Sequence, residues 1–461
     1  MALTTKTPGV YIQEISTLPA SVAQVETAIP AFLGYTSIDP GEPVRVSSMV
    51  EYEENFGGSY MAVTANITGT SPNVLGAVTA DTTYIMYQCM QMYFANGGGP
   101  CYVISTGLSG GGVDDGDYTD PGGALDMLSK EDEPTLIVMP EIMALSNTSI
   151  TDTDAFYTVI QAALAQCNEL QDRFTIIDVY EGSSTFPLTD PIGKLRDDIG
   201  TQYLKYGAVY YPQLDTTLSY NNDAIVFSGT AYAGQTLQEV IDLAETDATA
   251  AEFLLDIKPD LDVALGNLTI TLPPSSTIAG VYARVDSDRG VWKAPANVSL
   301  NNVSSPTIKI SNDDQEDMNV TSSGKSVNAI RAFSGKGVLV WGARTLAGND
   351  NEWRYVPVRR LFIVMEESIK NATEFVVFEP NDRNTWARTK AMIENYLTGL
   401  WRQGALAGAK PEQAFFVNVG LGQTMTAQDI LEGKLIIEVG VAAVRPAEFI
   451  ILNFSHKLQE S

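Results

Sequence analysis

The chain contains few side chains of the kinds that enzymes use to break bonds. His456 is the single histidine among the 461 residues, and it lies close to the C-terminal end. A Ser-His-Asp or Cys-His triad would have to use it, and no Gly-x-Ser-x-Gly sequence supplies a nucleophile. Cys89, Cys101 and Cys167 are widely spaced and form no Cys-x-x-Cys pair, which is typical of small buried apolar residues rather than a zinc site. The sequence therefore predicts a protein that is not an enzyme, with no catalytic, cofactor-binding or metal-binding residue and no cofactor.

Two glycine-containing stretches resemble phosphate-binding loops only in part. Residues 96–100, Asn-Gly-Gly-Gly-Pro, follow a predicted helix, whereas a phosphate loop follows a strand and opens a helix. Ser323-Gly324-Lys325-Ser326 matches the end of a Walker A loop, but Asn319 occupies the position of its first glycine. We interpret both stretches as turns.

Acidic residues provide the remaining candidates for a ligand site. Asp178 ends a predicted strand of an α/β layer, a place where ligand-binding residues are often found. No histidine, lysine or metal cluster is predicted beside it, so a structural role is the preferred interpretation and an enzyme with an Asp-centred site is the alternative. Two clusters could suggest calcium, but neither forms a twelve-residue loop closed by a glutamate, and we interpret them as solvated loops. These are Asp114, Asp115, Asp117 and Asp120, and Asp313, Asp314, Glu316 and Asp317.

Charge is distributed unevenly along the chain, which has a formal net charge of −28. Residues 1–270 hold 8 of the 28 Lys and Arg and 36 of the 56 Asp and Glu, so the rest of the chain is neutral. An acidic surface repels nucleic acid and anionic membranes. A charge-balanced region, by contrast, suits dense packing against copies of itself. We therefore expect no nucleic-acid partner.

Targeting signals are absent from the sequence. No cationic segment with an apolar core opens the chain, and no apolar run approaches the length of a membrane span. We expect synthesis in the cytoplasm without a signal peptide and no direct membrane insertion.

From Leu125 onward the chain alternates between predicted strands and helices, which is typical of a parallel α/β layer. The predicted strands of this layer are Leu136–Met139, Phe174–Val179 and Ala208–Tyr211, and its predicted helices are Phe156–Leu170 and Ile192–Tyr203. Before it we predict strands at Ala28–Tyr35 and Cys101–Ser105 and a helix at Tyr84–Phe94. Residues 213–270 are polar, with one helical segment around Leu237–Leu255, and we interpret them as a surface insertion.

The last fifth of the chain predicts a compact mixed unit. Its centre is a helix whose apolar residues recur at helical spacing, capped by Asn384 or Thr385 and stopping near Gly404. The apolar positions of that helix are Trp386, Ile393, Leu397, Leu400 and Trp401. Strand-like runs surround it at Leu361–Met365, Phe375–Phe378, Phe415–Val419, Leu435–Val444 and Glu448–Phe454, and a short polar helix spans Thr426–Gly433.

Both chain ends carry apolar strands with no local partner. Val10, Tyr11 and Ile12 form one of them, and Phe449, Ile450, Ile451, Leu452 and Phe454 form the other. An unprotected strand invites pairing with another chain. Pairing within the same subunit is the alternative, because terminal strands are common in ordinary sheets.

Several ordered motifs resemble the contractile tail sheath proteins of myophages and related injection machines. The similarity covers nearly the whole chain except residues 60–75 and 213–270. The motifs are Leu272–Asn297, Asn328–Leu346, Tyr355–Ile369, Phe378–Thr389 and Arg445–Leu452, together with Thr7–Ile15 and Phe94–Val103.

The resemblance implies a structural subunit that polymerises as stacked hexameric rings into a helical sheath around an inner tube. It implies that baseplate and terminal cap proteins are further partners, and that the terminal arms are exchanged between neighbouring subunits to complete a shared sheet. The extended sheath would be a metastable packing that contracts to drive the tube through a target envelope. The short helix with Asp429 and Glu432 resembles the tube-facing element of the family, and we expect it to contact a basic stripe on the tube.

The expected fold is mixed α/β. It has a core built from both terminal segments, a middle domain that the resemblance implies to be subtilisin-like in shape, and a surface insertion. We expect an exchange arm at 1–20, the N-terminal part of the core at 21–106, an outer α/β domain at 107–212 and the insertion at 213–270. The rest of the middle domain would follow at 271–354, and the C-terminal core domain with its exchange strand at 355–461. Eight motif arginines are expected in ion pairs, either between subunits or within the core: Arg284, Arg289, Arg331, Arg344, Arg359, Arg360, Arg383 and Arg388.

A contractile sheath subunit is thus the leading hypothesis. An α/β enzyme centred on Asp178 would be a monomer or small oligomer with a ligand pocket, and it leaves the terminal arms unexplained. A carbohydrate-binding or adhesive surface protein would carry a secretion signal. The sequence does not distinguish a phage tail from a bacteriocin, a secretion system or an extracellular injector.

Overall fold

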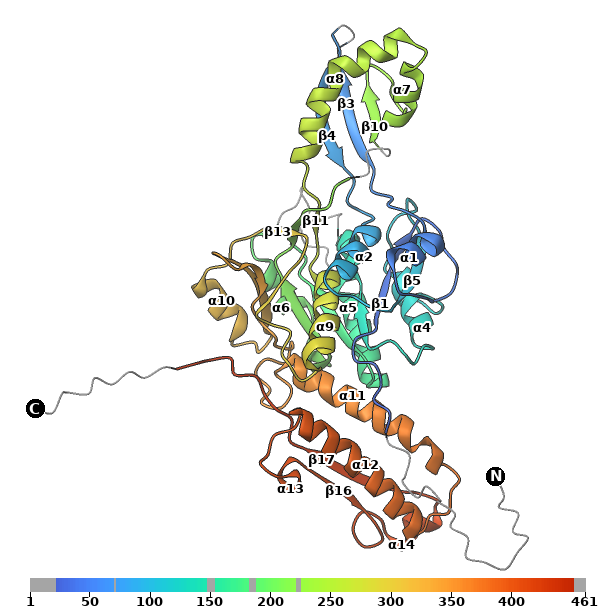
Figure 1. Ribbon diagram of the computed structural model, residues 1–461, viewed down its shortest axis with the longest axis vertical. Coiled ribbons are helices and arrows are strands. Elements are labelled where there is room, and N and C mark those ends of the chain that lie inside the picture. The colour runs from blue at the N-terminus through green and yellow to red at the C-terminus, as the bar shows by residue number, and fades with distance from the viewer. Residues whose placement is uncertain (1–21, 70–71, 147–153, 182–187, 221–224, 452–461) are drawn as a thin grey trace, which may run out of the picture. The chain divides into compact units, whose positions relative to one another are not determined.

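The chain divides into two compact units in the computed structural model, which describes residues 22–69, 72–146, 154–181, 188–220 and 225–451 (Figure 1). The large unit comprises Glu26–Val364 and Arg445–Ser461, and the small unit comprises Met1–Val25 and Met365–Val444.

A nine-stranded sheet forms the centre of the large unit. Its order is β12-β15-β14-β8-β7-β6-β1-β5-β2, and the six strands from β14 to β5 are parallel. The antiparallel strands β12, β15 and β2 lie at its two edges. The strands are β1 Pro30–Thr36, β2 Val44–Val46, β5 Cys101–Leu108, β6 Leu136–Val138, β7 Phe174–Asp178, β8 Gly207–Tyr211, β12 Val298–Ser299, β14 Val327–Phe333 and β15 Gly337–Val340. The predicted parallel layer is confirmed.

Helices cover both faces of this sheet, as the continuous burial of β7 requires. Thr175 of β7 contacts Cys167 of α5, with 3.2 Å between oxygen and sulfur. Asp178, three positions further on, accepts a hydrogen bond from the backbone N–H of Ser275 at the start of α9. Because side chains alternate along a strand, α5 and α9 lie on opposite faces. The helices of this region are α1 Met49–Phe56, α2 Met86–Ala95, α3 Gly116–Thr119, α4 Ala124–Leu128, α5 Asp154–Leu170, α6 Pro191–Asp198, α9 Ser275–Arg289 and α10 Asn312–Asn319, with 3-10 turns η1 Pro140–Ser146 and η2 Leu204–Tyr206.

The segment predicted as an insertion builds a module together with residues 63–80, and its hydrophobic core also includes Ile85, Cys89 and Met92 at helix α2. In it, β10 Ile225–Gly229 pairs with β3 Val63–Thr68, which pairs with β4 Val74–Ala80. Helices α7 Leu237–Ala244 and α8 Ala248–Asn267 pack with these strands. The segment leaves and rejoins the large unit through the small sheet β11-β9-β13, formed by β9 Leu214–Thr216, β11 Thr271–Leu272 and β13 Val303–Pro306.

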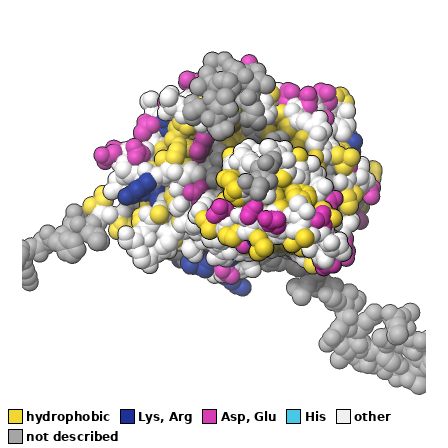
Figure 2. Space-filling model, turned by 90° about the horizontal axis from the view of Figure 1, so that it is seen from above, with side chains coloured by type: hydrophobic (Ala, Val, Ile, Leu, Met, Phe, Trp, Pro, Cys, Tyr) yellow, Lys and Arg dark blue, Asp and Glu magenta, His cyan; other side chains and the backbone are white. Residues whose placement is uncertain are grey.

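The surface of this module is acidic. Lys258 is the one Lys or Arg among residues 225–268, against eight Asp and Glu. Figure 2, which looks onto this end of the large unit, shows acidic side chains scattered among apolar ones, with few Lys or Arg. Such a surface favours solubility over association with an acidic partner.

The small unit is a helical pair on a two-stranded sheet. Helix α11 Val356–Thr373 contributes its second half, and α12 Arg383–Gln403 packs against β16 Phe415–Val419, which pairs with β17 Ile437–Val441 (Figure 1). Short helices α13 Pro411–Ala414 and α14 Ala427–Leu431 and the 3-10 turn η4 Glu374–Val376 complete it.

Three expectations for this region are wrong. Leu361–Met365 is the middle of α11 rather than a strand, because a run of five apolar residues fits a helix buried on several sides equally well. Phe375–Phe378 is not a strand: it comprises the end of a 3-10 turn and a further turn at 377–378. The Phe378 side chain in that second turn is fully exposed. The N-cap of α12 is Asp382, whose carboxylate accepts from the N–H of Thr385, rather than Asn384 or Thr385.

The predicted central helix of the small unit is confirmed, as is its end. Along α12, Ile393, Leu397 and Leu400 are buried, whereas Trp386 and Trp401 are partly buried. The helix terminates at Gly404, which has a left-handed backbone that glycine adopts without strain.

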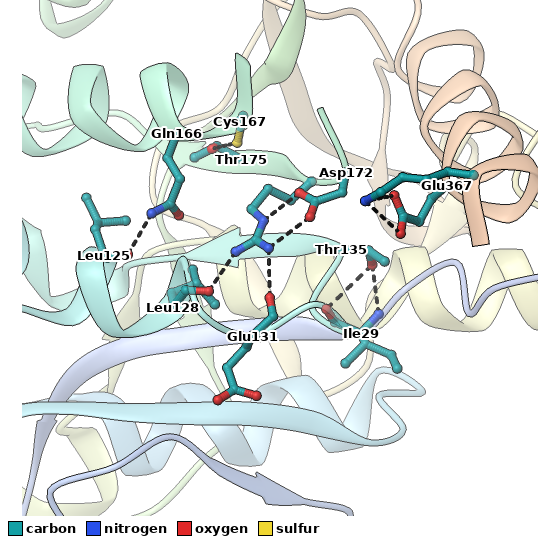
Figure 3. Close-up of polar contacts among 12 residues, drawn as sticks. Ile29, Leu125, Leu128, Glu131, Thr135, Gln166, Cys167, Asp172, Thr175 and Glu367 are labelled. Carbon is teal, nitrogen blue, oxygen red and sulfur yellow. Dashed lines mark hydrogen bonds and ion pairs between the residues drawn. The ribbon is translucent and has the colours of Figure 1, made fainter. Parts of the chain in front are cut away.

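Arg173 is one of the largest fully buried side chains of the large unit and joins two of its segments. Its guanidinium donates to the carbonyls of Leu128 and Glu131, both at 2.9 Å, and forms a two-pronged contact with Asp172 at 2.7 and 3.0 Å (Figure 3). The Arg173 side chain is 1% exposed. This contact ties the segment after α4 to the turn between α5 and β7.

Two buried carboxylates fasten other segments around the sheet. Asp178 accepts from Ser275 N–H at 2.8 Å, and Glu141 accepts from the N–H groups of Ile85 and Met86 at 2.7 and 2.9 Å. Burial raises the pKa of each carboxyl to about 7, although the hydrogen bonds from neighbouring residues oppose that rise. Each carboxylate satisfies backbone donors at the start of a helix, which would otherwise be buried without partners.

Replacing Arg173 by Met should destabilise the large unit by about 3 kcal/mol or more, because Asp172 and two carbonyls lose their buried partner. Urea unfolding followed by circular dichroism measures the loss. The matched control is Lys130→Met, which removes the exposed ion pair between Lys130 and Asp126 and should cost less than about 1 kcal/mol. Equal losses in the two variants would contradict the role of Arg173.

The melting temperature should fall as the pH rises from about 4 to about 7, and less so in Asp178→Asn. The folded-state pKa of Asp178 is raised, so its contribution to stability is complete below the ordinary value near 4 and is lost as the pH approaches 7. A residual fall should persist in the variant because Glu141 titrates in the same range. Thermal unfolding across the pH series tests this, with exposed Asp260→Asn as the control, and an unchanged slope in Asp178→Asn would refute it.

Candidate functional site

The β16–β17 pair offers backbone edges to another chain. The strands are antiparallel with Phe415 opposite Val441 and Val419 opposite Ile437, and they have no further strand partner among the described residues. Val417 and Val419 are buried, and α12 packs against their strand. A two-stranded sheet with open edges is the kind of surface to which an additional strand pairs.

Phe416 and Gly440 lie next to each other on the opposite face of this sheet. They are directly paired across the strands, and the Phe416 ring lies where a side chain at position 440 would begin. Half of the Phe416 side chain remains exposed. An aromatic ring over a strand glycine shields the backbone at that position.

The C-terminal segment leaves this sheet and carries exposed apolar side chains. Phe449, Ile450 and Ile451 are 69%, 78% and 82% exposed and belong to no strand. Leu452 and Phe454 lie outside the described residues, so the predicted strand Glu448–Phe454 has no counterpart in the part that is described. Exposure of three consecutive large apolar residues is unusual at a protein surface and is typical of interaction sites.

The N-terminal candidates Val10, Tyr11 and Ile12 also lie outside the described residues. The described chain begins at Val22, which is buried. Within the small unit, the N–H of Val25 donates to the Ser368 hydroxyl of α11 at 3.1 Å. This hydrogen bond attaches Val25 to helix α11.

Asp429 and Glu432 are exposed but not free of partners. Asp429 accepts from the N–H and hydroxyl of Thr426 in a capping box, which lowers its pKa. Glu432 pairs with Lys434 at 2.7 Å and accepts from Gln428, which lowers its pKa too. Leu431 between them is 82% exposed. The predicted helix is confirmed, while the tube-facing role of its acids stays a prediction.

The motif arginines differ in the groups that their side chains contact. Arg360 forms a buried ion pair with Asp286 at 2.6 Å, with both side chains 3% exposed. Arg359 stacks on the rings of Tyr206 and Trp353. These two neighbours on α11 have roles within the core, which is one of the two alternatives that the sequence left open.

Arg344 forms an ion pair within the large unit, one of the two alternatives expected for the motif arginines, and its partner is Glu448, more than one hundred residues away. The sequence predicts Glu448 only as the start of a strand and does not indicate this partner. The one feature that distinguishes Glu448 is that it is the only acidic residue of the motif Arg445–Leu452.

The Asp-centred alternative finds no accessible group. Asp178 and Glu141 are 3% and 0% exposed, and both accept hydrogen bonds from backbone N–H groups. Across the described ranges, no group of three His, Cys, Asp or Glu side chains has the geometry to hold a metal ion. The helices of those ranges also include none long and apolar enough to cross a membrane.

Comparison with known proteins agrees with the sequence motifs. The family described as phage tail sheath protein central domain matches residues 207–346, and the phage tail sheath C-terminal domain matches residues 348–457. A curated tail sheath protein of Vibrio phage KVP40 is 23% identical over 40% of this chain. The chain spans about a quarter of the length of that relative, since the match covers 26% of it.

Solved structures match from end to end. The helical sheath of the anti-feeding prophage in its contracted state is 34% identical, with 98% of this chain and 100% of that chain covered and a TM-score of 0.64. The sheath complex of an extracellular contractile injection system in its contracted state is 32% identical, with 99% of both chains covered and a TM-score of 0.66. Identity above 30% over the full length of both chains is the similarity expected of one family, and the chain therefore belongs to the family of contractile tail sheath proteins.

Proposed function

We propose that this chain is the repeating subunit of a contractile sheath that polymerises helically around an inner tube. The observation that carries the proposal is the end-to-end similarity to sheath chains of contracted assemblies. In the extended sheath the subunits are held in a metastable packing, and contraction to a wider lattice drives the tube through a target envelope. The subunit then resides in an assembled phage tail or injection particle.

Assembly joins the subunits through exchanged strands. Val10, Tyr11 and Ile12 at one end, and Phe449, Ile450, Ile451, Leu452 and Phe454 at the other, pair with the open edges of β16 and β17 in neighbouring copies. The exposed Phe449–Ile451 and the incomplete two-stranded sheet support this assignment. A head-to-tail contact of this kind gives a helical polymer of stacked hexamers when its rotation does not close.

Further partners follow from the same architecture. We infer contacts with an inner tube protein, with a baseplate and with terminal cap proteins, because one similar chain comes from a structure of an anti-feeding prophage baseplate. We propose 1–20 as the arm, 107–212 and 271–354 as the middle domain and 213–270 as the insertion. The described part of 21–106 was expected to form the sheath core with 355–461, but it contributes β1, β2 and β5 to the central sheet of the large unit. Asp429 and Glu432 face the tube.

An Asp-centred enzyme is the weaker candidate. No observation favours it, since Asp178 is buried and its carboxylate accepts a hydrogen bond from the backbone N–H of Ser275.

Deleting residues 1–15 should abolish polymer formation while leaving the chain folded, because the deleted segment contains one exchanged strand. Negative-stain electron microscopy of the purified full chain should show striated hollow tubes, alone or with tube protein added. Circular dichroism and the melting temperature of the unassembled chains serve as the folding control. Striated tubes of normal length from the truncated chain would contradict strand exchange by the N-terminal arm.

Replacing Asp429 and Glu432 by Lys should leave sheath polymers intact but prevent co-assembly with the tube, because opposite charges then become like charges. Asp429→Asn with Glu432→Gln separates charge from helix capping, since Asn still accepts from the Thr426 N–H. That neutral pair should weaken co-assembly in a salt-dependent manner. The control is Glu245→Lys with Glu252→Lys on the acidic module, and co-sedimentation with tube protein is the measurement. Unchanged co-assembly of the Lys pair would disprove the tube-facing assignment.

A further inference from the structure

Glu448 is held by three elements of the large unit. Its carboxylate accepts from Arg344 at 2.6 Å from Nη2 and at 3.0 Å from Nε. Asn319 at the end of α10 donates its side-chain N–H at 2.7 Å, and the Tyr355 hydroxyl donates at 3.1 Å. The carboxylate thus receives donors from three segments that are separated in the sequence.

Arg344 is itself rigidly placed. Its side chain is 4% exposed, and its Nη1 donates to the Asn319 carbonyl at 3.0 Å. Its backbone N–H donates to the Asn328 side chain at 2.7 Å, and its carbonyl accepts from the same amide at 2.8 Å. Because Asn328 belongs to β14, the contact at Glu448 is connected to the central sheet.

The residues around Glu448 have a different environment. Arg445, Ala447 and Phe449–Ile451 are exposed, whereas the Glu448 side chain is only 22% exposed. Glu448 as a whole residue is exposed and Pro446 is partly buried, but the Glu448 side chain itself is mostly covered by its contacts with Arg344 and Asn319. Burial opposes its ionisation, but the contacts with Arg344 and Asn319 outweigh burial and lower the pKa of Glu448, so the ion pair is charged at neutral pH.

We propose that Glu448, through Arg344, is the anchor that connects the exchanged C-terminal arm to the central sheet of the large unit. The partner that pulls on the arm is a second copy of this chain, so the inference rests on the proposed function. Without the anchor, tension on the arm would act on β17, a five-residue strand in a two-stranded sheet that is weak by itself. With it, the load passes to Arg344 and β14, and Glu448 acts as a positioning residue for the exchanged strand.

The test compares the full-length wild type with Glu448→Gln and the matched control Glu252→Gln, an exposed glutamate of α8. The critical concentration for sheath formation is measured by pelleting and electron microscopy, with tube protein present. All assays are run well below the melting temperature of each variant, so that every chain is folded. Under these conditions a residue that only stabilised the fold would not change the critical concentration.

Glu448→Gln should raise the critical concentration by about tenfold or more, because removing one partner leaves a buried charge unpaired and loosens the arm. Glu252→Gln should match the wild type. Assembly of Glu448→Gln at the wild-type concentration would overturn the anchor while leaving the proposed function intact. A wild type that forms no sheath even with tube protein would contradict the proposed function, and the anchor with it.

Discussion

The backbone edges of β16 and β17 are the constraint from which the assembly behaviour of this chain follows. Two strands can satisfy each other only along the side they share, so their outer N–H and C=O groups need partners from elsewhere. A sheet of this size is also weak in isolation. In the proposed strand exchange, strands from neighbouring subunits would satisfy these edges and enlarge the sheet in one step. The incomplete sheet of one chain would then be a specific means of joining many copies.

The large unit follows the opposite principle, because its polar groups are satisfied internally. Six parallel strands are covered on both faces, and buried Arg173, Glu141 and Asp178 each bind backbone groups of neighbouring segments. Such contacts resist gradual deformation, since displacing one segment leaves a buried polar group without a partner. A unit of this kind suits a machine in which rigid bodies move and only their connections change. The ion pair between Arg360 and Asp286 extends the same principle to the first half of α11.

The sequence predicts five of the six strands that are parallel in the central sheet, β1, β5, β6, β7 and β8, because each is a short apolar run bounded by turns or helical patterns. It does not predict β14 or the antiparallel edge strands. Leu361–Met365 was misassigned because a helix buried on several sides loses its periodicity. The pairing of β3 with β10 could not be predicted, since it joins segments about 160 residues apart in sequence, as Ile225 opposite Val63 illustrates. The contact between Arg344 and Glu448 was inaccessible for the same reason, because spacing carries no information about partners so far apart.

The distribution of charge shows where copies of the chain can approach each other. Nearly all of the net charge lies in residues 1–270, and in the module of α7 and α8 one lysine stands against eight acids. Like charges on identical subunits repel, so that module is poorly suited to be the main contact between copies. Residues 271–461 carry equal numbers of acids and bases and include β16, β17 and the exposed Phe449–Ile451. The neutral charge and exposed apolar side chains of residues 271–461 therefore favour association through the C-terminal part of the chain rather than through the acidic module.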